Sequence, residues 1–139
     1  MYARSKVFSI FPLLALLLAV LLSACAPVSA SQALPATVEV AYGEEVVVND
    51  LTVRFNTVIE DSRCPADAIC IQAGQAVVSV NVSANGQEDS LELTNVPDGG
   101  EPVEFQGYRI SLQDLQPYPL ASQPASPEAY QASILIEEA

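Results

Sequence analysis

The stretch QAVVSVNVSANG, residues 75–86, decides the fold of this 139-residue chain. Apolar residues occupy every second position, which is the period of a half-buried strand and not of a helix. The stretch ends in Asn85-Gly86, and both residue types tolerate the positive φ of a type I′ turn. We therefore expect a strand and then a tight hairpin. One face of the strand would carry Ala76, Val78, Val80, Val82 and Ala84, and the other Gln75, Ser79, Asn81 and Ser83.

The same alternation recurs on both sides of this stretch, with turn-prone residues between the runs. Shorter alternating runs lie at 38–42, 45–48, 89–94 and 130–137. The pattern predicts an all-β domain over residues 38–139, a single sandwich or small barrel of seven to eight mostly antiparallel strands. The two longer flanking runs place Leu51, Val53, Phe55, Thr57 and Ile59 opposite Thr52, Arg54, Asn56 and Glu60, and Tyr108, Ile110 and Leu112 opposite Arg109, Ser111 and Gln113.

Residues 116–128 interrupt the strand pattern with Pro117, Pro119, Pro124 and Pro127. Proline has no backbone N–H to donate, so this segment cannot pair regularly in a sheet. We expect a loop here before the last strand. Long loops are often functional or simply flexible, and both interpretations stay open.

The N-terminus is typical of a secretory signal peptide. Arg4 and Lys6 precede an apolar run over residues 10–22, and Ser23 and Ala24 follow it. The run is shorter than the roughly 18 residues that a membrane-spanning helix needs. A signal peptide over residues 1–24 is therefore expected. The alternative is a poorly anchored membrane helix.

The sequence Leu22-Ser23-Ala24-Cys25 resembles the lipobox of bacterial lipoproteins. The resemblance implies cleavage before Cys25 and acylation of this residue, for instance with palmitate. Two or more acyl chains anchor a protein stably, whereas one chain is marginal. We expect residues 25–37, rich in Ala, Ser and Pro, to form a flexible tether to the outer face of a membrane, the outer membrane where the organism has one. The alternative is ordinary cleavage that leaves Cys25 as an unpaired thiol.

Composition excludes several functional classes. The chain has no His, which removes Ser-His-Asp and Cys-His nucleophile systems and His-ligated zinc. Residues 25–139 contain three cations and all seventeen acidic residues, a formal charge of −14. This charge disfavours nucleic acid as a partner. We expect no catalytic residues, no metal site and no cofactor.

The most informative motif is the segment between the two best strands, which contains Cys64 and Cys70. If Cys25 is acylated, these two remain as an even pair in an oxidising compartment, where a disulfide is expected. Asp61 can accept backbone N–H groups as an Asx cap, and Pro65 stiffens the turn. Arg63 has five donors for Asp61 or nearby carbonyls. We favour a structural clamp, and the alternative is a binding loop that exposes Arg63 for recognition.

This segment also resembles an uncharacterised family of small bacterial secreted proteins and lipoproteins with a motif of the form D-S-R-C-P-x(n)-C-[IV]-W-A-G. The resemblance implies an all-β domain and extends over most of residues 38–137. The family has no established activity, so the resemblance implies no function. Gln72 stands where the family usually has Trp, which puts in doubt any packing or binding role of that ring. The matching residues are Asp61, Ser62, Arg63, Cys64, Pro65, Cys70, Ile71, Ala73 and Gly74.

Other acidic candidates are weaker. Asp98-Gly99-Gly100-Glu101 and the pair Asp61 with Asp67 offer oxygen ligands for Ca²⁺, but they lack an EF-hand register, and solvated turns are favoured. We expect a lipid-anchored, non-enzymatic domain of the cell envelope that binds an envelope protein or a small ligand, or has a structural role. The alternatives are a protease inhibitor that uses the Cys64–Cys70 loop and a carboxylate-dependent hydrolase.

Overall fold

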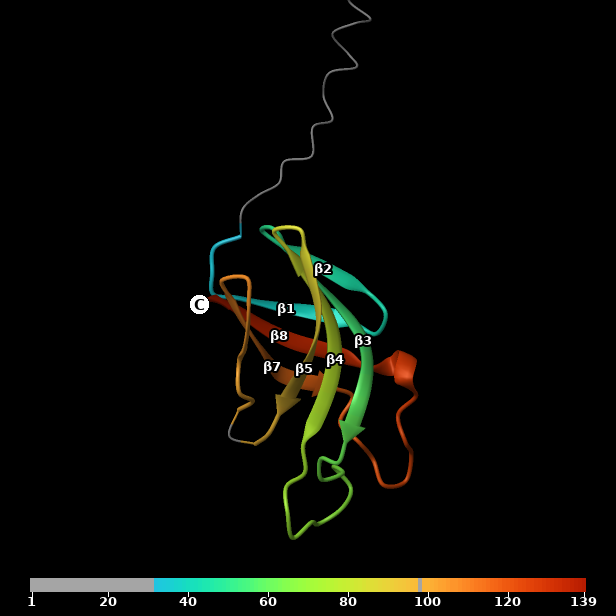
Figure 1. The fold of residues 1–139 in the computed structure, drawn as a ribbon. Coiled ribbons are helices and arrows are strands. Elements are labelled where there is room, and N and C mark those ends of the chain that lie inside the picture. The colour runs from blue at the N-terminus through green and yellow to red at the C-terminus, as the bar shows by residue number, and fades with distance from the viewer. Residues whose placement is uncertain (1–31, 98) are drawn as a thin grey trace, which may run out of the picture. The chain divides into compact units, whose positions relative to one another are not determined.

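The computed structural model describes residues 32–97 and 99–139, so the predicted signal peptide and Cys25 lie outside the described residues. In the described part, eight strands form two antiparallel four-stranded sheets with the orders β1-β8-β7-β6 and β2-β3-β4-β5 (Figure 1). The predicted all-β sandwich is confirmed. The elements are β1 (Ala36–Ala41), β2 (Glu45–Val48), β3 (Leu51–Asp61), β4 (Ala76–Ala84), β5 (Gln87–Asn95), β6 (Val103–Phe105), β7 (Tyr108–Gln116), the 3-10 helix η1 (Pro127–Ala129) and β8 (Gln131–Glu138).

The core lies between the two sheets and is built from the alternating apolar rows. Strand β4 follows the prediction, because Ala76, Val78, Val80, Val82 and Ala84 are all buried. The hairpin to β5 turns at Asn85 and Gly86, whose φ angles are 53° and 73°, and Ala84 pairs with Gln87. Both positive values agree with the expected type I′ turn.

Strand β3 departs from the predicted alternation at its second half. Its pairing with β4 shifts register between Phe55 and Thr57, and again between Val58 and Glu60. Each β-bulge adds one residue to β3 and so exchanges the faces of the residues that follow. The prediction that Thr57 and Ile59 face the core is therefore wrong: Val58 packs against the core, and Ile59 is 50 % exposed.

Four smaller differences come from the local structure. Strand β1 begins at Ala36, two residues before the expected start, and strand β6, which the sequence pattern did not predict, has only three residues, too few for a clear alternation. Ser111, predicted on the outer face of β7, is buried and accepts a hydrogen bond from Gln113 Nε2 at 2.9 Å. The predicted loop over residues 116–128 contains the bridge between Leu120 and Gln123 and the start of η1.

The cysteine segment and the first described residues lie at opposite ends of the sandwich (Figure 1). Gln32 accepts a hydrogen bond from Asn49, which stands just before β3 begins, whereas Cys64 follows the end of β3. Strand β3 has eleven residues. At about 3.3 Å per residue, it separates the two ends by roughly 30 Å.

Candidate functional site

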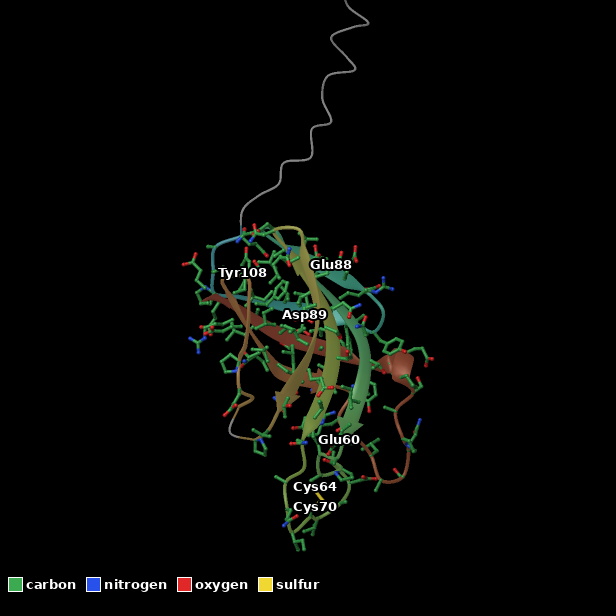
Figure 2. All side chains as sticks on the ribbon, in the orientation of Figure 1. Glu60, Cys64, Cys70, Glu88, Asp89 and Tyr108 are labelled. Atoms are coloured by element: carbon green, nitrogen blue, oxygen red, sulfur yellow. A yellow bond between two sulfur atoms is a disulfide. The ribbon has the colours of Figure 1, made fainter. Side chains whose placement is uncertain are left out.

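The candidate site is the cysteine loop, residues 62–75, which connects β3 to β4 and extends beyond their ends (Figure 2). Cys64 and Cys70 form a disulfide with a Cα–Cα separation of 5.9 Å, as predicted. Four groups of contacts hold the loop on the sandwich: the Arg63 side chain, the junction at Ser62, the Asp67 carboxylate and the disulfide itself. Together they leave one part of the loop uncovered.

Arg63 points inward and is only 6 % exposed. Its Nε and Nη2 donate to the two carboxylate oxygens of Asp61 at 2.7 and 2.8 Å. Nη1 donates to the carbonyl of Leu115 at 2.5 Å, and Nη2 also donates to that of Pro117 at 3.1 Å. The guanidinium lies 4.4 Å from the ring centroid of Tyr118, within cation–π range. This arrangement is the structural clamp that we favoured, and it leaves Arg63 inaccessible for recognition.

Asp61 reaches this position because of the second bulge in β3. The bulge at Ile59 sets Asp61 opposite Ala76, so the carboxylate faces the core side of the sheet. Burial alone would raise the pKa of Asp61, but the hydrogen bonds and charge of Arg63, with a hydrogen bond from Tyr130 Oη at 3.0 Å, lower it. The pKa of Arg63 is raised, because the bonds to Asp61 outweigh its own desolvation. Both groups are therefore charged over the whole physiological range.

The junction of the loop is closed by backbone contact between its two ends. Ser62 N donates to the carbonyl of Gln75 at 2.8 Å, and Gln75 N donates to Ser62 Oγ at 3.2 Å. Gly74 is required here, since a Cβ on it would lie 1.5 Å from the carbonyl oxygen of Ser62. Glu60 accepts a bond from Ser62 Oγ at 2.6 Å, which together with a bond from Gln75 lowers its pKa.

Asp67 joins the cysteine loop to the proline-rich loop. Its carboxylate accepts the backbone N–H of Ala121 at 2.6 Å and that of Ser122 at 3.2 Å. These bonds lower the pKa of Asp67, and the bond from Ala121 has the largest effect. Ala66 N also donates to the carbonyl of Pro119 at 3.0 Å. The proline-rich loop is thus a support for the cysteine loop, a role that the sequence did not suggest.

The calcium hypothesis for Asp61 with Asp67 is wrong for this structure. Asp61 is engaged by Arg63 and Asp67 by the proline-rich loop, so their oxygens are not directed at a shared ion. Within residues 32–97 and 99–139, no group of three or more His, Cys, Asp or Glu side chains is placed to hold a metal. The other candidate turn includes Asp98, which lies outside the described residues.

The uncovered part of the loop is its tip, residues 68–73. Ile69 and Ile71, on either side of Cys70, are fully exposed, and Gln72 beside them is exposed as well. Pro65, by contrast, is half-buried at the base of the loop. Ile71 belongs to the sequence motif, whereas Ile69 is not among the predicted site residues. The exposure of Ile69 was predictable, because a seven-residue ring is too short to bury an isoleucine in a core of its own.

A second feature lies on the outer face of the β2-β3-β4-β5 sheet. It is a shallow hollow of about 340 Å³ whose lining residues include Glu45, Arg54 and Glu88. Figure 2 shows Glu88 on β5, away from the cysteine loop. Glu45 pairs with Arg54 and Glu88 with Ser83 on this face, whereas the neighbouring Asp89 pairs with the core-facing Val82 and so points to the other side of the sheet.

No protein-family model, curated protein or solved structure matches this chain. Among the described residues, none forms a helix long and apolar enough to cross a membrane.

Proposed function

We propose that this chain is a lipid-anchored, extracytoplasmic and non-enzymatic binding domain that presents the tip of the cysteine loop to a protein of the cell envelope. One observation carries the proposal: Ile69 and Ile71 are fully exposed on a loop that is otherwise held tightly to the sandwich. Exposed apolar groups of this kind are typical of interaction sites. Arg63, the other candidate for recognition, is buried in the clamp.

The tip can supply useful binding energy at low cost. Burial of an isoleucine side chain contributes about 1.5–3 kcal/mol, so the pair offers roughly 3–6 kcal/mol. The disulfide and the Arg63 clamp order the loop before binding. Binding by an ordered loop avoids most of the conformational entropy that a flexible segment would lose.

The position of the tip also suits an anchored protein. The described chain begins at Gln32, at the end of the sandwich opposite the cysteine loop (Figure 1). An anchor at Cys25 would therefore hold the tip away from the membrane by the tether plus the roughly 30 Å length of β3. This supports a partner in the space beyond the membrane surface.

The binding test uses the full chain expressed with its own N-terminus. Mass spectrometry of the mature protein should find an acylated Cys25, and C25S should abolish labelling with a palmitate analogue. The acylated protein is then used to capture partners from envelope extract, beside a variant with I69S and I71S. V47S is the matched control, because Val47 is an exposed aliphatic residue on β2 (59 %). A partner retained by V47S and lost from the tip variant supports the proposal, and equal capture by all three contradicts it.

A second candidate is the carboxylate-dependent hydrolase, and the hollow with Glu45 and Glu88 beside Arg54 is the observation that favours it. Paired carboxylates can serve as acid and base in glycoside hydrolysis. Hydrolysis of a panel of chromogenic glycosides, abolished by E45Q with E88Q and kept by E92Q, would support this candidate. The binding domain is preferred because both carboxylates are open to solvent.

A further inference from the structure

The tip of the cysteine loop has the chemistry of a peptide substrate. Residues 68–73, Ala-Ile-Cys-Ile-Gln-Ala, are uncharged in a domain that carries −14 outside its signal peptide. Ala68 and Cys70 alternate with the two isoleucines, and the tip is solvent-exposed. No residue of segment 64–73, all of which the structure describes, has a positive φ, and the chain bends at Ile71 and Gln72. The bend presents this peptide bond on an exposed part of the loop.

Both sides of the Ile71–Gln72 peptide bond are fixed to the sandwich. On the N-terminal side, Cys70 is tied by its disulfide to Cys64, which adjoins the buried Arg63. On the C-terminal side, Gly74 packs against the backbone of Ser62, and Gln75 is hydrogen-bonded to Ser62. Since this bond lies outside the disulfide ring, the two contacts independently hold the chain on either side of it.

From these contacts we propose, resting on the binding function above, that the tip is an inhibitory loop for serine endopeptidases whose specificity pocket accepts aliphatic side chains, with Ile71 in that pocket. An endopeptidase cleft is concave and receives an exposed segment of another protein. Rigid, preorganised loops are the usual ligands in protease–inhibitor complexes, which change little in shape on binding. The buried Arg63 excludes the form of the inhibitor hypothesis that used a cation for recognition.

The fixed ends explain how such a loop would inhibit without being consumed. Attack of the peptidase serine on the Ile71 carbonyl breaks the peptide bond, forms an ester to the enzyme and leaves the amine of Gln72. In a flexible substrate this amine diffuses away, and water then hydrolyses the ester. Here the contacts at Cys70 and Gly74 keep the amine beside the ester. Its attack on the ester re-forms the peptide bond and releases the serine.

Charge favours a protein over a membrane as the occupant of the tip. A domain with a charge of −14 is repelled by anionic lipid headgroups. The two isoleucines also bury too little apolar surface for stable insertion into a bilayer, since even a single myristoyl chain binds membranes only marginally. Sedimentation with vesicles of phosphatidylcholine and phosphatidylglycerol therefore belongs in the test as the outcome that would assign the tip to a membrane.

The inhibition test uses the full mature chain against leukocyte elastase, which accepts aliphatic side chains, and trypsin, which requires a cation. Wild type is expected to inhibit elastase and not trypsin. I71K should weaken elastase inhibition at least 100-fold and create trypsin inhibition, because the residue in the specificity pocket sets the preference. V47K is the matched control and should inhibit elastase as wild type does. Equal melting temperatures of the variants ensure that folding is not the cause.

Three results would overturn this inference. They are no elastase inhibition by wild type, an I71K variant with unchanged specificity, and sedimentation with vesicles that depends on Ile69 and Ile71. If inhibition is absent while capture of an envelope protein still depends on the tip, the inhibitor assignment is wrong and the binding function stands. If capture is also independent of the tip, both are wrong.

Discussion

Replacement of Arg63 by alanine tests the clamp that organises the cysteine loop. The side chains of Arg63 and Asp61 are only 5 % and 8 % exposed, and the guanidinium makes four hydrogen bonds. Without the Arg63 side chain, the Asp61 carboxylate is left as a buried charge with no cation beside it, bonded by Tyr130 and by the backbone N–H of residue 63, and two carbonyls lose their donor. Removal of one partner of a buried ion pair costs about 3–5 kcal/mol. For a domain of this size, that corresponds to a fall of roughly 12–20 °C in Tm.

Urea unfolding followed by circular dichroism measures this loss. R54A is the matched control, because Arg54 is an exposed arginine on β3, the strand that leads into the loop, and should change the free energy of unfolding by less than about 0.5 kcal/mol. R63K keeps the charge but loses the planar fork, so it should fall between R63A and wild type, and it remains measurable if R63A does not fold. An R63A variant as stable as R54A would refute the clamp.

Three further perturbations address other supports of the same loop. Replacement of both Cys64 and Cys70 by serine should lower the free energy of unfolding by about 2 kcal/mol, because a seven-residue ring is opened; unfolding in urea with and without reductant checks this. Since the pKa of Asp61 is lowered in the folded state, its ionised form stabilises the fold above the unfolded value of about 3.9, and this contribution is lost as pH falls through the folded value. D61N should therefore flatten stability curves below about pH 4 and reduce stability at pH 7. G74A should cost about 3 kcal/mol, at the upper end for overpacking, because its Cβ meets backbone. G43A should cost only about 1 kcal/mol, because a Cβ at Gly43 would meet no atom and only the positive φ disfavours alanine there. Equal melting temperatures for G74A and G43A would contradict the steric role of Gly74.

The fold class could be predicted because the alternation of apolar and polar residues is a local property of the sequence, and turn-prone residues mark where each strand ends. The β4–β5 hairpin agrees with the sequence in register and in turn conformation. The second half of β3 does not, because a bulge is decided by how a strand pairs with its neighbour. Nothing in the residues around Asn56 and Ile59 marks either one as the extra residue.

The site was predictable in its short-range contacts and not in its long-range ones. The bond between Arg63 and Asp61 spans two residues and could be proposed from the sequence. The bonds from Arg63 to Leu115 and from Ala121 to Asp67 join segments more than fifty residues apart. Such contacts depend on the packing of the end of β7 and of the β7–β8 connection against the cysteine loop, which only the three-dimensional arrangement reveals.

The same arrangement separates stability from recognition within one short loop. Arg63 and Gly74 face the sandwich and the disulfide closes the loop, so changes at these positions alter the free energy of unfolding. Ile69 and Ile71 face solvent, so polar substitutions there should leave unfolding within about 0.5 kcal/mol of wild type. A tip variant that stays stable and loses binding therefore cannot owe the loss to misfolding. The dependence runs in one direction only, because inhibition by the tip needs the ends that the disulfide and Gly74 hold, whereas the stability of the clamp does not need the two isoleucines.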